Sequence, residues 1–183
     1  MDCLKGRLLV AAPVLGDENF DRTVVLLLEH GDEGALGVVL NRPSGLEVSD
    51  PLPEWSPYAL EPEVVFIGGP VSRSSVIALA RFDGDASGAA WEQVLGSDGV
   101  VDLSHDPVLI GGSLGAVRVF AGYAGWGPGQ LEAEIAVGGW FVVDADATDP
   151  LSPAPEDLWS AVLRRQRGTL ALFAAYPSDP SLN

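Results

Sequence analysis

The chain has 183 residues, 47% of them hydrophobic and 20% charged, so it can bury a core and is not intrinsically disordered. Ten Lys and Arg stand against 26 Asp and Glu, which gives a formal net charge of −16. A field of that sign repels nucleic acid and anionic membranes and favours basic partners.

Cys3 is the only cysteine, so no disulfide can form within the chain, which favours a reducing compartment. The N-terminal residues lack the pattern of a signal peptide, and the apolar run 8–14 is too short to span a membrane. We therefore expect a cytoplasmic protein. Without an internal repeat or long linker, residues 1–183 are expected to form a single domain.

Short apolar and β-branched runs recur along the chain and predict strands. These runs cover residues 7–13, 23–29, 35–40, 63–67, 76–82, 100–103, 116–124 and 139–143. A turn over 31–34 predicts that the second and third strands pair as an antiparallel hairpin. Residues 41–45 break the pattern, and four prolines within 46–62 rule out a long helix there, though one turn over 46–49 is compatible with them.

Helices are expected over residues 128–136 and 156–165, with a helical turn over 90–95. For the first helix, Pro128 suits the first position and Gly127 the N-cap. The second presents one apolar stripe, made of Leu158, Trp159, Val162 and Leu163. Residues 169–175 are compatible with a strand or a helix, and 144–155 read as a loop.

The stretch from Gly122 to Ile135, G-Y-A-G-W-G-P-G-Q-L-E-A-E-I, is the most unusual in the chain. It lacks the lysine of a phosphate-binding P-loop and the context of a dinucleotide fingerprint. Two interpretations stay open. Either Tyr123 and Trp126 pack in the core at a strand-to-helix turn, or they form part of a surface for a ligand or partner.

Three familiar chemical patterns fail on inspection. Gly111–Gly115 matches G-x-S-x-G, but a strand follows it and both histidines precede Ser113, unlike a hydrolase. Asp144, Asp146 and Asp149 lack the Gly and Glu of a calcium loop, so we expect a solvated acidic loop. Two distant histidines and one cysteine cannot build a His/Cys zinc site. We therefore expect neither a metal nor a cofactor.

Four blocks in order resemble the AlgH/YqgE family of bacterial proteins. They are E-H-G-D-E-G-A-L-G-V-V-L-N-R-P (29–43), G-G-P-V (68–71), G-Y-A-G-W-G-P-G-Q-L-E-A-E (122–134) with Gly139-Trp140, and P-S-D-P-S-L-N (177–183). The resemblance implies an α+β fold: one compact β-rich domain whose barrel-like or bifurcated sheet is flanked by short helices. Family members often end one strand in Leu-His, whereas this chain has Leu79-Ala80-Arg81.

Members of the family are often labelled transcriptional regulators, yet this chain has no helix-turn-helix and no basic helix. We therefore expect a non-enzymatic binding or regulatory module that does not bind DNA directly. Its partner, a protein or a small ligand, and its oligomeric state stay open. The alternative is an enzyme of unassigned class that uses Glu29, His30 or Glu132.

The expected binding surface combines two of the blocks. The hairpin block contributes two dipeptides, 29–30 and 41–42, which lie at opposite ends of the hairpin or across its turn, depending on register. The Gly-rich block contributes aromatic contact area and free backbone N–H groups. The candidate residues are Glu29, His30, Asn41, Arg42, Tyr123, Trp126, Gly127, Gln130 and Glu132.

Overall fold

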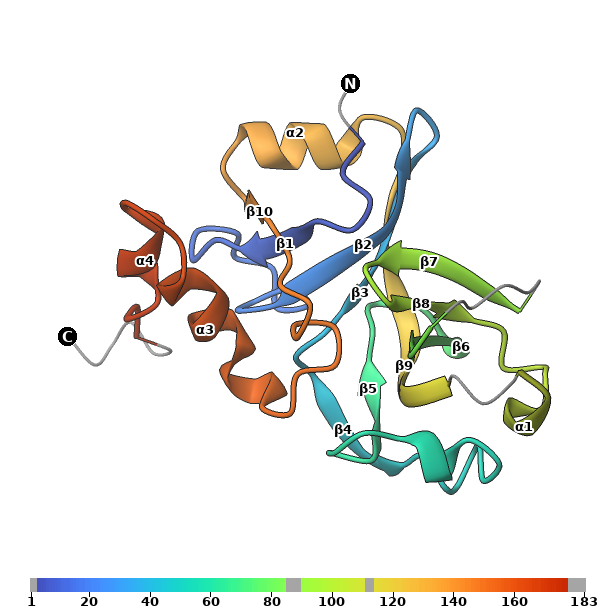
Figure 1. Ribbon diagram of the computed structural model, residues 1–183. Coiled ribbons are helices and arrows are strands. Elements are labelled where there is room, and N and C mark those ends of the chain that lie inside the picture. Colours follow the sequence, from blue (N-terminus) through green and yellow to red (C-terminus); the bar gives the residue numbers. More distant parts are fainter. Residues whose placement is uncertain (1–2, 85–89, 111–113, 178–183) are drawn as a thin grey trace.

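The computed structural model describes residues 3–84, 90–110 and 114–177. Within them, ten strands form one connected sheet with the order β10-β1-β2-β3-β9-β6-β8-β7 and a side branch of β4 and β5 (Figure 1). The strands are β1 (Leu8–Ala11), β2 (Val24–Gly31), β3 (Gly34–Val39), β4 (Pro43–Glu47), β5 (Val64–Ile67), β6 (Val71–Phe82), β7 (Trp91–Leu95), β8 (Asp98–Val101), β9 (Leu114–Trp126) and β10 (Trp140–Val143).

The helices are short. They are the 3₁₀ turns η1 (Ser56–Tyr58) and η2 (Pro155–Asp157) and the α-helices α1 (Pro107–Ile110), α2 (Gln130–Ala136), α3 (Leu158–Arg164) and α4 (Leu170–Phe173). None of the described helices is long and apolar enough to cross a membrane.

The sheet divides at β9, its longest strand. One edge of β9 pairs with β6. The other edge of β9 pairs with two strands: Ala124–Trp126 pairs with β3, and Phe120 and Ala121 pair in parallel with β5. The expected bifurcated, β-rich α+β fold is therefore confirmed. The strand order ends at β10 and β7, which do not pair with each other, so the sheet is not closed into a barrel.

Helices cover both faces of the β1–β2–β3 part of the sheet, as Figure 1 shows. Alternate residues of β1 therefore belong to different core clusters, because successive side chains of a strand point to opposite faces of the sheet. Leu8 and Val10 pack in one core cluster with α3, while Leu9 and Ala11 pack in another with Leu131 of α2. Burial on both faces explains why these strands read as uninterrupted apolar runs.

Some predicted elements differ from the structure. Residues 90–95 are not a helical turn but strand β7, paired with β8. Strand β4 lies where the sequence predicted a break, and β6 begins five residues before the predicted position 76. Helix α2 starts at Gln130 with Gly129 as its N-cap at φ 71°, so Gly127 and Pro128 precede the helix. Residues 170–173 form helix α4, one of the two alternatives.

Candidate functional site

The two aromatic residues of the Gly-rich stretch lie on opposite faces of β9. Tyr123 packs against the cluster covered by α3, and Trp126 belongs to the cluster covered by α2. Only 6% of Trp126 is exposed, and its ring contacts those of Phe20 and Trp140. Tyr123 and Trp126 therefore do not share one surface, and Trp126 is a core residue, as in the first interpretation.

A carboxylate that the sequence analysis missed holds this cluster together. One oxygen of Glu134 accepts the indole N–H groups of Trp126 at 2.9 Å and Trp140 at 2.8 Å. Its other oxygen accepts from Gln130 at 3.0 Å, and Gln130 in turn accepts the backbone N–H of Gly127 at 3.1 Å. Buried indoles need an acceptor, so Glu134 anchors α2 to the sheet.

His30 occupies a closed position between β2, α2 and the N-terminal segment. Its side chain is 3% exposed, and Nε2 lies 2.9 Å from Oε1 of Glu132. Nδ1 accepts the backbone N–H of Leu4 at 3.2 Å, so Nε2 is the atom that carries the proton. With both nitrogens engaged, His30 has no free lone pair with which to act as a general base.

Glu132 and Glu29 differ in their surroundings. The pKa of Glu132 is lowered from its ordinary value, chiefly by a hydrogen bond from its own backbone N–H and further by His30. Glu29 is exposed and lines a small cavity of about 160 Å³ together with Glu92 and apolar side chains of β2, β3, β6, β7 and β8. The two acids thus do not share a partner.

Asn41 and Arg42 lie at the other end of the β2–β3 hairpin from His30, since Val25 pairs with Val39 and His30 with Ala35. Asn41 accepts the N–H of Val24 at 2.9 Å and donates to the carbonyl of Arg22 at 2.8 Å. The candidate residues of the hairpin therefore separate into two groups: Glu29 and His30 lie at one end of the hairpin, and Asn41 and Arg42 lie at the other.

Arg42 fastens the loop over residues 17–22. Its guanidinium donates to three backbone carbonyls, those of Glu18, Asn19 and Asp21, rather than to a carboxylate. In the same loop, Phe20 lies with its ring centroid 5.3 Å from that of Trp140. Arg42 thus holds in place the loop whose Phe20 packs against Trp126 and Trp140, which is a structural role.

Three glycines of the family-like sequence blocks, Gly34, Gly68 and Gly69, lie where two backbone segments of the chain come into close contact. A Cβ on Gly69 would lie 2.1 Å from the carbonyl carbon of Tyr123, and one on Gly68 would lie 2.3 Å from the oxygen of Gly122. A Cβ on Gly34 would lie 2.1 Å from the oxygen of Trp126. These three glycines therefore allow β9 of the same chain to lie close to their backbone.

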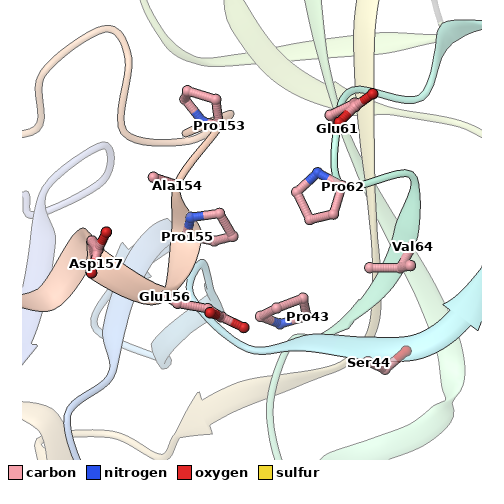
Figure 2. A pocket seen from close by; sticks show the side chains of 10 residues that line it. All are labelled: Pro43, Ser44, Glu61, Pro62, Val64, Pro153, Ala154, Pro155, Glu156 and Asp157. Carbon is pink, nitrogen blue, oxygen red and sulfur yellow. The ribbon is translucent and has the colours of Figure 1, made fainter.

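A cleft of about 510 Å³ lies between the β4–β5 branch and η2, outside the predicted set (Figure 2). We call it the proline cleft. It is lined by Pro43, Ser44, Glu61, Pro62, Val64, Pro153, Ala154, Pro155, Glu156 and Asp157. In Figure 2 Pro62 and Pro155 lie on opposite sides of the gap, and Glu156 reaches toward Pro43.

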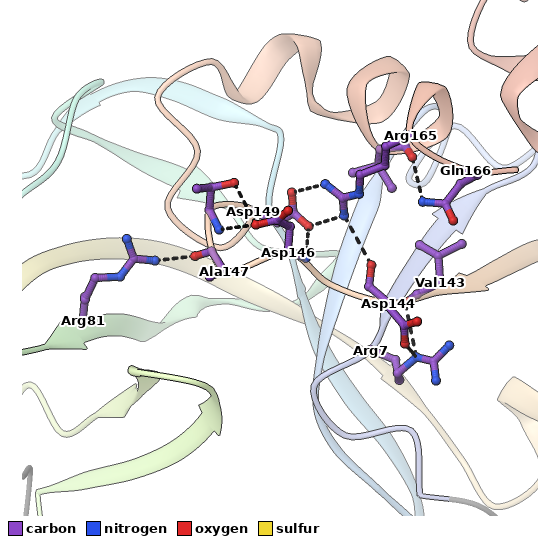
Figure 3. A network of polar contacts seen from close by, with 11 residues as sticks. Arg7, Arg81, Val143, Asp144, Asp146, Ala147, Asp149, Arg165 and Gln166 are labelled. Atoms are coloured by element: carbon purple, nitrogen blue, oxygen red, sulfur yellow. Dashed lines mark hydrogen bonds and ion pairs between the residues drawn. The ribbon is translucent and has the colours of Figure 1, made fainter.

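Arginines hold the loop that forms one wall of this cleft, residues 144–154 (Figure 3). Arg165 makes a two-pronged pair with Asp149, and Arg81 donates to the carbonyl of Ala147 at 2.6 Å. The pair raises the pKa of Arg165. Because Asp149 is only 3% exposed, the expected fully solvated acidic loop is wrong at this residue.

Arg118 links the two segments that form the walls of the cleft. It is 2% exposed and donates to the carbonyl of Ser152 at 2.7 Å and to that of Glu61 at 2.8 Å. Its guanidinium also lies 4.5 Å from the ring centroid of Phe66. Burial lowers the pKa of Arg118 to about 10.

Among the described residues, no group of three His, Cys, Asp or Glu side chains is arranged to hold a metal ion. Residues 111–113 of the G-x-S-x-G pattern lie outside the described residues.

Comparison with known proteins places the chain in a family. A family model described as AlgH-like matches residues 8–171. The UPF0301 protein SCO2948 of Streptomyces coelicolor is 56% identical over 98% of this chain and 95% of its own length. The UPF0301 protein RHA1_ro03630 of Rhodococcus jostii is 45% identical over 97% of this chain and 90% of its own.

Two solved structures share the fold. The crystal structure of DIP2367 from Corynebacterium diphtheriae aligns with a TM-score of 0.88 and 36% identity, covering 93% of this chain and 91% of that one. The solution structure of AlgH from Pseudomonas aeruginosa aligns with a TM-score of 0.71 and 34% identity, covering 97% and 96%. The chain therefore belongs to the AlgH-like family.

Proposed function

We propose that this chain is a non-enzymatic binding module for a basic protein partner, and that any effect on gene expression passes through that partner. The observation that carries the proposal is how the ten basic residues are used. Seven of them contact carboxylates, carbonyls or aromatic rings of the same chain; they are Lys5, Arg7, Arg22, Arg42, Arg81, Arg118 and Arg165.

The side chains of the remaining three, Arg73, Arg164 and Arg167, make no hydrogen bond or ion pair within the described residues. Duplex binding requires several cations that neutralise phosphates together, each adding roughly −0.9 to the salt slope. A formal charge of −16 instead attracts a cationic protein and speeds its association at low salt.

The candidate residues differ in whether they can contact a partner protein directly. Exposed members of the predicted set, Glu29, Gly127 and Gln130, remain candidates for partner contact. Buried members such as His30 and Trp126 contribute by stabilising the fold that carries the exposed residues. The geometry of His30 also gives no support to the enzymatic alternative, because neither of its nitrogens is free to take a proton from a substrate.

The proposal is tested with three peptides of equal length, one basic, one neutral and one acidic, and with a duplex DNA. Each is titrated into the full chain at about physiological ionic strength and again at low salt. We expect one saturable site for the basic peptide, weakened by salt, and no binding of the acidic peptide. Nanomolar retention of the DNA, or equal binding of all three peptides, would overturn the proposal.

A further inference from the structure

The proline cleft is rich in hydrogen-bond acceptors and poor in donors. Four of its ten lining residues are prolines, which have no backbone N–H. Ser44 has the only lining side-chain hydroxyl, and it already donates to the carbonyl of Val65 at 2.5 Å. The other polar side chains are the carboxylates of Glu61, Glu156 and Asp157. A ligand for this cleft must therefore supply donors.

We propose that the proline cleft binds an arginine side chain of an extended basic segment in the partner, an inference that rests on the proposed function. A guanidinium is planar, weakly hydrated and rich in donors, so it can lie between apolar ring faces and still reach a carboxylate. Pro62 and Pro155 provide apolar rings on the two sides of the cleft, and Glu156 provides a two-pronged acceptor.

The cleft is fixed before the ligand arrives. Arg118 holds Glu61 on one wall and Ser152 beside the other through their carbonyls, so the spacing of the walls does not depend on a ligand. Proline rings add further stiffness because their φ angles are fixed. Such preorganisation lowers the entropy that binding must overcome.

Charge and size favour a segment of protein over a bare cation. Three carboxylates outnumber the one buried cation, Arg118, so the cleft as a whole attracts positive charge. These carboxylates do not form a metal-binding group among the described residues. A volume of about 510 Å³ lies in the range of sites that accept several groups at once.

The test uses an eight-residue peptide with two arginines in a Gly/Ser background, together with versions that carry lysine, glutamine or glutamate at the same positions. Each is titrated into the full chain by calorimetry. We expect the arginine peptide to bind best, the lysine version more weakly, and the glutamine version at least about tenfold more weakly, because charge-assisted hydrogen bonds are lost.

Two double variants with the same change in charge locate the site. Glu61→Gln with Glu156→Gln should weaken the arginine peptide by about tenfold or more. Glu18→Gln with Glu33→Gln, two exposed acids that do not line the cleft, should change the affinity less than about twofold. Thermal melts of both variants verify that each remains folded.

The outcomes separate this inference from the proposed function. Equal weakening by the two double variants would mean that the basic peptide binds elsewhere, which overturns the cleft and leaves the basic partner in place. Absence of binding by every cationic peptide would overturn both. Preference for the glutamate peptide would show that Arg118 dominates the cleft and that its ligand is an anion.

Discussion

Trp126 donates its indole N–H to a carboxylate oxygen of Glu134 at 2.9 Å, and this bond joins the last residue of β9 to the middle of α2. The same oxygen accepts from Trp140, so one carboxylate fixes two tryptophans. Since Trp126 is almost fully buried, its contribution is to the stability of the fold.

We expect Trp126→Ala to lower the free energy of unfolding by about 3–5 kcal/mol, because it removes a large core side chain and leaves a cavity. Trp126→Phe should cost less, since it keeps most of the ring volume and loses the hydrogen bond to Glu134. Urea unfolding followed by circular dichroism measures both. An unchanged midpoint for Trp126→Ala would place the residue at the surface.

The pair of Arg165 and Asp149 predicts an asymmetric response to mutation. Arg165→Ala leaves the carboxylate of Asp149 buried at 3% exposure without its cation, which should cost about 3–5 kcal/mol. Asp149→Ala should cost less, because the side chain of Arg165 is 31% exposed and can turn to water. Denaturant unfolding ranks the two.

Arg164→Ala, at an exposed neighbouring position, serves as the control for that comparison and should stay within about 0.5 kcal/mol. A larger loss for Asp149→Ala than for Arg165→Ala would contradict the assignment of Asp149 as the buried partner.

The lowered pKa of Glu132 predicts that the folded protein loses stability in acid. Its pKa in the folded protein lies below its ordinary value of 4.5, so it stabilises the fold above that value and loses this contribution as the pH falls through the folded pKa. We expect the unfolding midpoint of the wild type to fall more steeply between about pH 5 and pH 3 than that of Glu132→Gln. Parallel pH profiles would contradict this role.

The sequence predicted the central strands because they are long apolar runs, such as the one that becomes β2. It failed at residues 90–95, where the helix propensity of Ala, Glu and Gln was misleading. There Gly96, at φ 55°, turns the chain so that β7 pairs with β8, and this pairing overrides local propensity.

The candidate site was predicted in part only. The predicted strand ended at residue 124, whereas β9 continues to Trp126 and so places Tyr123 and Trp126 on opposite faces. The i, i+4 spacing of Gln130 and Glu134 was a signal for their contact. No local pattern predicts the proline cleft, because its walls come from residues 43–64 and residues 153–157, which lie far apart in the sequence.

The place where the arginine peptide binds is measured directly by following the amide and methyl NMR shifts of the full chain during titration with that peptide. If the arginine peptide binds in the proline cleft, we expect saturable changes at the lining residues Ser44, Val64 and Ala154 and little change at the buried Trp126. Changes confined to residues 122–132, with the cleft residues unmoved, would contradict binding in the cleft.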